Sequence, residues 1–461
     1  MAEKFIIYNS PSIMPEKKKL PKCWLVTVDM GYGHQRAAYP LKKFAYSGMI
    51  NANTYPGIPT EDRKIWHDQR KFYEFVSRFK RVPVLGDAVF DIMDWFQRVP
   101  DFYPKRNLSR PSLQLLSIMY MTKHKNWGKH LIDKLAKKPL PLVSTFFAPA
   151  FMAEAHNYPG DIYCLICDAD ISRSWVSVVP KNSRINYLAP NTRVVERLQL
   201  YGVPKNKIFL TGFPLPEENL DYPQFTSARN DLKYRLFNLD PRKKYLSQYK
   251  DSLLKNMKLK SWPKKADHPL TVTFAVGGAA AQRELGVTIV KSLASKISAG
   301  EIKINLIAGV HSDVQKYFKD EVIKLGLKKE LGKMVTILFE KDKQEYMKKF
   351  NQLLKKTDIL WTKPSELSFY CAIGLPIIIA PPIGSQEYFN QKWLINMGTG
   401  INQENPKYVN EWLFDWLNSG RLAESAAQGF LEAPKMGVDN ISKVLEKCGG
   451  KVKGVCYVSQ Y

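Results

Sequence analysis

The segment VTVDMGYGHQRAAYPL, Val26 to Leu41, places a histidine directly after an apolar run and two glycines. Gly31 and Gly33 carry no side chain, so a strand that ends there lets the chain pass close to a ligand and directs helix amides toward it. The third glycine of the dinucleotide fingerprint is missing. The segment predicts a binding site that includes His34, although a histidine with only a structural hydrogen bond is the alternative.

A second glycine pair lies in TFAVGGAAAQRELGVTIV, where Gly277 and Gly278 close an apolar strand and lead into a helix. Free backbone amides near residues 279–281 are suited to cradle a pyrophosphate. A tight strand-to-helix turn without a ligand is the alternative.

A third group of polar side chains follows predicted strands in TDILWTKPSELSFYCAIGLPIIIAPPIGSQEYFNQKW. In open α/β sheets the carboxyl ends of the strands form the ligand side. The residues concerned are Lys363, Ser365, Glu366, Gln386, Glu387 and Asn390.

Short β-rich runs alternate with amphipathic helices through most of the chain, which predicts parallel sheets in an α/β architecture. The Pro-rich segment GFPLPEENLDYPQ, which begins at Gly212, divides two such sets and is typical of a domain linker. Two α/β halves joined by a linker place a cleft between them, where ligands usually bind. The strands expected are CWLVTVD, LPLVSTFF, IYCLIC, RINYLA and KIFLTG in the first half, and LTVTFAVGG, IKINLIAG, MVTILFE, TDILWT and LPIIIAPP in the second.

Between Glu61 and Lys138 the pattern changes to helices rich in aromatic and basic residues. Helical spacing puts Phe72, Phe75, Val76 and Phe79 on one face, and the bases around that face are Lys71, Arg78, Lys80 and Arg81. An interfacial membrane surface and a core helix with a solvated basic flank fit this pattern equally well.

The net charge of +26, from 69 Lys and Arg against 43 Asp and Glu, implies a polyanionic partner or surface. No apolar run is long enough to cross a bilayer, and no signal-peptide pattern opens the sequence, so a cytoplasmic protein is expected. Cys164 and Cys167 are interpreted as buried thiols, and no function is assigned to Cys448 and Cys456.

Four motifs in a fixed order carry a family resemblance: DMGYGHQRAA, CDADISRSWVSVVPKNSRINYLAPNTRVVERLQLYGVPKNKIFLTGFPL, VGGAAAQ and GSQEYFN. The chain resembles the GT-B glycosyltransferases of family 28, above all the branch of monogalactosyldiacylglycerol synthase and processive diacylglycerol glucosyltransferase. The motifs are similar to that family's acceptor loop, Asp-to-Trp segment with helix and linker, donor phosphate loop and Gly-Gln-Glu-x-x-Asn, respectively, and they span most of the chain.

The resemblance implies an α/β GT-B fold, with two Rossmann-like parallel-sheet domains facing a cleft. Residues 1–213 are expected to form the acceptor and membrane-side domain, with a helical insertion at about 61–138. Residues 214–445 are expected to form the donor domain, and residues 446–461 a tail.

The resemblance also implies roles for the candidate residues. His34 and Asp29 would lie where the sugar is transferred, as general base and orienting partner, and Gly31, Gly33 and Trp175 would line the acceptor side. Donor-side residues would be Gly277, Gly278 and Gln282 at the diphosphate, Gln386 and Glu387 at sugar hydroxyls, His311 and Lys363 as sources of positive charge, and Ser365, Glu366 and Asn390 beside them. No metal and no cofactor is expected, since helix amides can supply the positive field and no Asp-x-Asp motif stands out.

One position departs from the family pattern. The family has a glutamate that holds the nucleotide ribose five residues before Gly-Leu-Pro, where this chain has Phe369. Glu366 lies three residues earlier, on much the same helical face, and is the candidate substitute. The alternative is that no residue replaces the glutamate, which would change the nucleotide bound or abolish catalysis.

The function expected is the transfer of a sugar, with inversion and without metal, from a nucleotide-sugar, with UDP as the expected nucleotide, to a lipid such as diacylglycerol. The protein would act at the anionic inner face of the membrane. The alternatives are a catalytically silent GT-B-like binding protein and a nucleotide-sugar epimerase or hydrolase on the same fold. Nucleic acid is suggested by charge alone and is not expected as a partner.

Overall fold

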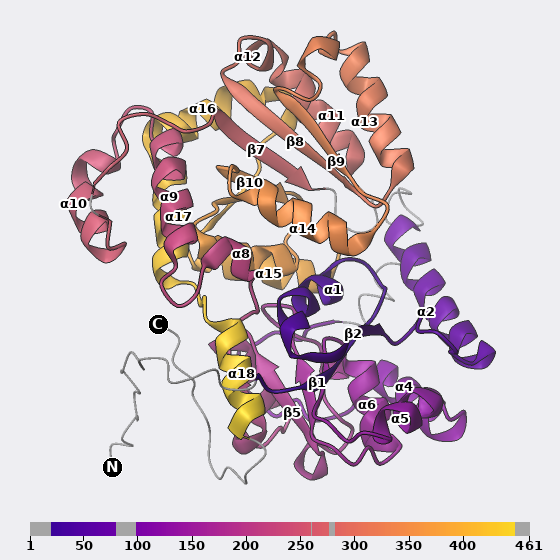
Figure 1. The fold of residues 1–461 in the computed structure, drawn as a ribbon. Helices are drawn as coiled ribbons and strands as arrows, with labels where there is room; N and C mark the ends of the chain where they lie inside the picture. Colours follow the sequence, from indigo (N-terminus) through magenta and orange to yellow (C-terminus); the bar gives the residue numbers. More distant parts are fainter. Residues whose placement is uncertain (1–19, 80–97, 260, 276–281, 448–461) are drawn as a thin grey trace.

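The computed structural model describes residues 20–79, 98–259, 261–275 and 282–447, and side chains on the first of these stretches as far as Lys71. Two parallel six-stranded sheets dominate the fold, one from each half of the chain (Figure 1). Helices pack on both, and the two sheets lie one above the other in the view of Figure 1.

The N-terminal sheet has the strand order β2-β1-β3-β4-β5-β6, and each neighbouring pair is parallel. Its strands are β1 (Cys23–Thr27), β2 (Ala45–Asn51), β3 (Leu142–Ser144), β4 (Ile162–Leu165), β5 (Ile185–Ala189) and β6 (Ile208–Leu210). Its helices include α1 (Gly33–Ala38), α2 (Thr60–Phe79), α4 (Leu113–His124), α5 (Lys129–Ala136), α6 (Phe147–Ala155) and α7 (Thr192–Leu200).

The C-terminal sheet has the order β12-β11-β10-β7-β8-β9 and is also parallel throughout. Its strands are β7 (Leu270–Ala275), β8 (Ile302–Gly309), β9 (Val335–Phe339), β10 (Ile359–Thr362), β11 (Ile377–Ile379) and β12 (Gly400–Asn402). Its helices include α8 (Glu217–Leu220), α9 (Thr226–Leu239), α10 (Leu246–Asn256), α11 (Arg283–Ser292), α12 (Ala294–Ser298), α13 (Ser312–Lys324), α14 (Lys343–Leu354), α15 (Ser385–Asn396), α16 (Val409–Ser419) and α17 (Arg421–Glu432), with the 3-10 helix η6 (Glu366–Ile373) after β10.

Successive residues of β1 point to opposite faces of the N-terminal sheet, as the two-residue period of a strand requires. Trp24 and Val26 join an apolar core confined to the N-terminal half. Cys23 and Leu25 join a second core that continues into the C-terminal half. Burial on both faces explains why the central strands read as continuous apolar runs.

The last helix, α18 (Gly437–Lys447), returns to the N-terminal half (Figure 1). Its Asn440 donates a hydrogen bond from Nδ2 to the carbonyl of Thr211, at 2.9 Å. The chain therefore crosses between the halves at least twice among the described residues.

The ten strands expected from the sequence are all present, and the predicted GT-B class is confirmed by two Rossmann-like sheets whose carboxyl ends face each other. Two strands were missed: β2 is an edge strand that contains Ser47 and Gly48, and β12 has three residues. Both lack the apolar run that marked the others. Cys164 and Cys167 are buried free thiols, as expected.

Several expectations fall outside the described residues: the apolar and basic side chains beyond Lys71, the glycines Gly277 and Gly278, and the pair Cys448 and Cys456. In the stretches that are described, every helix is too short or too polar to cross a bilayer.

Candidate functional site

The two halves meet where the carboxyl ends of their strands face each other. The loops after β1 and β4 contact those after β8, β9, β10 and β11. We call this contact the seam, and it is made by residues 29–36, 168–169, 310–311, 343–346, 363–366 and 383–390. Most of the predicted site residues that the structure describes lie along it.

His34, the second residue of α1, is half-buried beside Phe146 and Trp175, with ring centroids 4.8 and 6.2 Å away. Its Nδ1 lies 2.7 Å from the carbonyl oxygen of Thr145. Because a carbonyl only accepts, the proton is assigned to Nδ1, and Nε2 keeps its lone pair. Burial lowers the pKa of His34 to about 4, so the ring is neutral at pH 7.

Asp29 follows β1 and forms an ion pair with Lys343, the first residue of α14. Asn53 fixes the backbone of Asp29, accepting from its N–H at 2.8 Å and donating to its carbonyl at 3.1 Å. The group that holds Nδ1 of His34 is therefore the Thr145 carbonyl, while the Asp29 carboxylate is directed across the seam.

Glu366 begins η6 and is buried against α1. Its Oε1 accepts a hydrogen bond from Nε of Arg36 at 3.0 Å. A Cβ on Gly33 would lie 3.0 Å from its Oε2, so the nearest neighbour of a side chain at this position would be a carboxylate of the same chain.

Lys363 and Glu387, two of the predicted donor-binding residues, form an ion pair with each other. Nζ of Lys363 lies 2.5 Å from Oε1 of Glu387, in the first turn of α15. Oε2 of Glu387 accepts from the backbone N–H of Ile383 at 2.7 Å. The charge of Lys363 is therefore partly neutralised, while Gln386 and Ser365 are half-buried beside this pair.

Asn390 is fully buried and joins the two halves. Its Oδ1 accepts from the N–H of Ala169 at 2.7 Å, and its Nδ2 donates to Oδ1 of Asp168 at 3.0 Å and to the carbonyl of Pro364 at 3.3 Å. Asn390 thus has a structural task at the seam and orients a carboxylate that sequence analysis did not single out.

Asp168 has an unusual pKa for a carboxyl group. Burial raises it to about 6, the charges of Glu366 and Glu387 act in the same direction, and the hydrogen bond from Asn390 opposes them. A sequence signal existed, because Asp168 directly follows the buried run of β4. A single acidic residue after a strand is too common a pattern to have identified it.

Tyr32 makes another contact between the two halves that the sequence did not predict. Its hydroxyl accepts from the backbone N–H of Val310 at 2.9 Å, across the seam. Its ring lies 6.3 Å from that of His311, which precedes α13, and 5.0 Å from that of Tyr346. His311 is thereby placed at the seam from the C-terminal half.

The remaining predicted residues lie apart from His34 or play a packing role. Gln282 donates to the carbonyl of Pro381 at 3.2 Å, Trp175 is buried, and Gly31 is exposed. Phe369 stacks on Phe213 of the linker, with centroids 4.7 Å apart and planes at 11°. The position at which the family has its ribose-binding glutamate is therefore part of the core in this chain.

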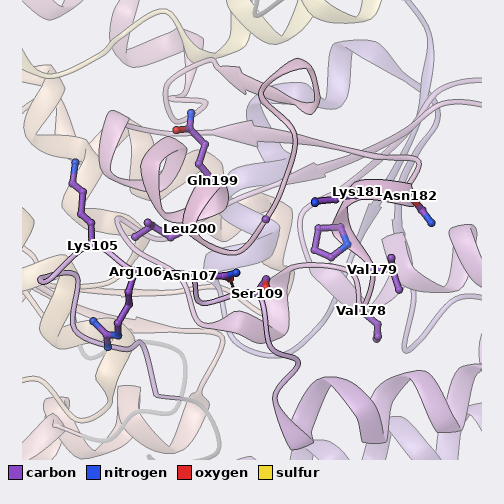
Figure 2. A pocket seen from close by; sticks show the side chains of 12 residues that line it. Lys105, Arg106, Asn107, Ser109, Val178, Val179, Lys181, Asn182, Gln199 and Leu200 are labelled. Atoms are coloured by element: carbon purple, nitrogen blue, oxygen red, sulfur yellow. Dashed lines mark hydrogen bonds between the residues drawn. The ribbon is translucent and has the colours of Figure 1, made fainter.

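A hollow of about 730 Å³ lies elsewhere, on the N-terminal half (Figure 2). It is lined by residues 105–107, 109, 178–182, 199, 200 and 202, and it includes none of the predicted site residues. Nζ of Lys105 is paired with Glu196 at 2.8 Å, and Arg106 donates to the carbonyls of Asp101 and Pro104. Two of its basic side chains, Lys105 and Arg106, are therefore already engaged, and we place the candidate site at the seam, where most of the predicted residues gather.

No protein-family model and no curated protein sequence matches the chain. Among solved structures, the chain is similar to MnaA of S. aureus with UDP, at 11% identity and a TM-score of 0.44, over 92% of this chain and 95% of that one. It is similar to the spinosyn rhamnosyltransferase SpnG at 12% identity and a TM-score of 0.40, over 92% of this chain and 100% of that one. It is also similar to the UDP-GlcNAc 2-epimerase of Methanocaldococcus jannaschii at 14% identity and a TM-score of 0.35, over 79% of this chain and 90% of that one. These likenesses are remote, and the fold class rests on the sheet topology.

Proposed function

We propose that the chain is a glycosyltransferase that moves a sugar from a nucleotide donor, UDP being the first candidate, to a lipid hydroxyl such as that of diacylglycerol. The observation that carries the proposal is the state of His34 at the seam: a neutral imidazole, with Nδ1 held by a carbonyl and Nε2 keeping its lone pair. A neutral imidazole with an available lone pair can accept the proton of an acceptor hydroxyl, which is the step that a general base performs in sugar transfer.

The proposed reaction proceeds with inversion. Nε2 of His34 takes the proton of the acceptor hydroxyl while its oxygen attacks the anomeric carbon of the donor sugar. The bond from that carbon to the nucleotide phosphate oxygen breaks, and the phosphate leaves with the electron pair. The Thr145 carbonyl stabilises the imidazolium through Nδ1–H, and the negative charge of Glu366 favours the protonated ring.

The proposed donor side is the C-terminal half, with Gln386, Ser365 and His311 as its polar groups at the seam. Lys363 supplies positive charge when a phosphate competes for it with Glu387. We propose that the transfer requires neither a metal nor a resident cofactor, with helix amides supplying the remaining stabilisation of the leaving group.

The proposed lipid contact is supported by the outer face of α4. Leu113, Leu116 and Tyr120 follow helical spacing and are 55%, 45% and 57% exposed, and Lys123 and Lys125 follow on the exposed surface. The neighbouring helix α2 adds exposed bases that include Arg63, Lys64 and Lys71. We call the three α4 side chains with these five bases the α4 patch. Exposed apolar side chains on a helix with bases at its end and on a second helix are suited to an anionic bilayer, which supports a peripheral protein at the inner face of the membrane.

A second candidate function is that of a catalytically silent binding protein, which takes a sugar nucleotide, a glycan or a protein partner without transfer. It is favoured by the packing of Phe369 against Phe213 and by the engagement of Glu366 with Arg36, because both positions then lack a free carboxylate for a ribose.

The first experiment is calorimetric titration of the metal-free protein with UDP, UDP-glucose, UDP-galactose and UDP-N-acetylglucosamine. We expect at least one of them to bind at micromolar level. Transfer of radiolabelled sugar from that donor to diacylglycerol vesicles should follow, and His34→Gln should abolish transfer while keeping donor affinity. Binding without transfer would favour the second candidate, release of free sugar or conversion to another UDP-sugar would favour a hydrolase or epimerase, and no binding would overturn a UDP-sugar function.

A further inference from the structure

Arg36 is a guanidinium of the N-terminal half that is held by side chains of the C-terminal half. Its Nε donates to Glu366 at 3.0 Å and its Nη2 to the hydroxyl of Tyr346 at 3.1 Å. Its central carbon lies 4.4 Å from the ring centroid of Phe350. The side chains of Arg36 and Glu366 are only 3% and 10% exposed, so this ion pair is shielded from water.

Glu366 lies beside α1 on both sides of His34. Its Oε1 binds Arg36, two residues after His34, and its Oε2 would lie 3.0 Å from a Cβ added to Gly33, the residue before it. A shift of Glu366 would therefore move the segment that carries the candidate base. The Thr145 carbonyl sets the tautomer of His34, while Glu366 sets where the segment lies relative to the C-terminal half.

The stability of the fold does not by itself explain why the ion pair of Arg36 and Glu366 is buried. Removing two charges from water costs about as much as their attraction returns, and apolar replacements of similar volume are often as stable. An ion pair between the two halves outside the seam, Lys43 with Glu217, is 37% and 56% exposed, and pairs of that kind contribute little. The buried pair instead fixes the position of Glu366 relative to Arg36, because a planar guanidinium binds a carboxylate in few orientations.

We propose that Arg36 and Glu366 are positioning residues that fix the His34 segment against the C-terminal half, and that Glu366 is not a ribose ligand. For its kinetic consequence this inference rests on the proposed transfer at His34. It replaces the expectation, drawn from the family resemblance, that Glu366 takes over the task of the missing glutamate.

The decisive variants are Glu366→Gln, which keeps shape and an acceptor for Arg36, and the double variant R36M/E366L, which replaces the pair by apolar side chains. Lys43→Met at the exposed pair is the matched control. We expect turnover of the UDP-sugar to fall by about 100-fold in the double variant and less in E366Q, because small displacements of a reacting group are that costly. The dissociation constant for UDP should stay within about twofold of wild type, since the pair acts on the reacting geometry rather than on donor binding.

A spectroscopic measurement tests the positioning without any substrate. Nitrogen-15 spectra of the imidazoles, with His34 assigned through His34→Gln, report its tautomer and ring environment. In wild type and K43M we expect one sharp Nδ1–H form, and in R36M/E366L a shifted or broadened signal while the melting temperature stays close to wild type. E366Q serves as the folded variant should the double variant not fold.

Three outcomes would overturn the inference: a weakened affinity for UDP in E366Q with unchanged maximal turnover, an unaltered His34 signal in both variants, or an equal effect of K43M. The proposed function fails separately, if wild type binds no UDP-sugar. In that case the His34 spectra still decide whether the pair positions the segment.

Discussion

At the scale of single residues, the seam contains two groups whose pKa values are shifted in opposite directions. Burial lowers the pKa of His34 to about 4, whereas burial and the neighbouring carboxylates raise that of Asp168 to about 6. His34 therefore keeps one protonation state between pH 5 and 8, and Asp168 changes its state within that range. Asp168 is therefore expected to contribute to any pH dependence that the seam shows near pH 6.

The first prediction concerns the affinity for UDP-glucose, whose diphosphate does not titrate near pH 6. Above that pH an ionised Asp168 adds negative charge beside Glu366 and Glu387, so affinity should fall as pH rises from 5 to 8. Asp168→Asn should weaken this dependence, with a difference from wild type of about threefold or more at pH 8. Calorimetric titration across this range measures it. Asp161→Asn, exposed at the other end of β4, is the control, and a pH dependence that is unchanged in D168N would refute the assignment.

At the scale of elements, buried polar side chains join strands and helices whose apolar runs the sequence revealed. Arg235 on α9 is 1% exposed and donates to four carbonyls, those of Leu354, Thr357, Ile373 and Gly374. It thereby satisfies the ends of α14 and η6 and fixes α9 beneath the start of β10.

The second prediction is that Arg235→Met destabilises the protein by about 3 kcal/mol or more, because buried carbonyls lose their donors. Urea unfolding followed by circular dichroism measures the change. Asn230→Ala, exposed on the same helix, should stay within about 0.5 kcal/mol of wild type. A value for R235M as small as that of the control would show that water replaces the lost bonds.

The third prediction concerns His268, which connects the start of β7 with that of β10 through Asp358, at 3.2 Å, and also binds Asp267, at 2.5 Å. Burial opposes its charge, but the two carboxylates outweigh burial and raise its pKa above the usual 6.5. Because the pKa of His268 is higher in the folded than in the unfolded protein, its protonated form stabilises the fold fully below about pH 6.5. This stabilisation is lost as the pH rises through the pKa of the folded state. The difference in unfolding free energy between wild type and His268→Gln should therefore shrink from pH 6 to pH 9. His124→Gln, exposed on α4, should show no such trend, and a constant difference for H268Q would contradict the mechanism.

The strands and the candidate site were not equally predictable. Ten strands were visible because a parallel sheet buried on both faces requires continuous apolar runs, whereas the edge strand β2 tolerates Ser47 and Gly48. His34 was singled out because it follows an apolar run and two glycines in the sequence, although its partner Thr145 lies 111 residues away. The partners of Arg36 and Asn390 lie hundreds of residues away, and such pairings depend on how the two halves dock, which local patterns do not encode.

At the scale of the whole molecule, the net charge of +26 sets the context for the α4 patch. Charge of that size attracts the protein to any anionic surface, but the attraction is screened by salt and does not determine which face of the molecule binds. The exposed apolar side chains of α4 would orient that helix toward the bilayer, and their insertion is insensitive to salt. The two contributions can be separated experimentally by comparing low and high ionic strength.

The fourth prediction is that the double variant L116S/Y120S binds vesicles of phosphatidylglycerol and phosphatidylcholine at least about tenfold more weakly than wild type in 0.3 M salt, since each buried apolar side chain is worth about 1.5–3 kcal/mol. In 0.05 M salt the difference should narrow, because the basic surface then retains the variant. Co-sedimentation with the vesicles measures both conditions.

Tyr249→Ser is the matched control: Tyr249 is 48% exposed, close to the exposure of Leu116 and Tyr120, but it lies on α10 of the other half. Equal losses in Y249S would mean that exposed apolar side chains anywhere on this basic protein promote binding. Unchanged binding of L116S/Y120S would remove α4 as the membrane contact and leave only nonspecific attraction.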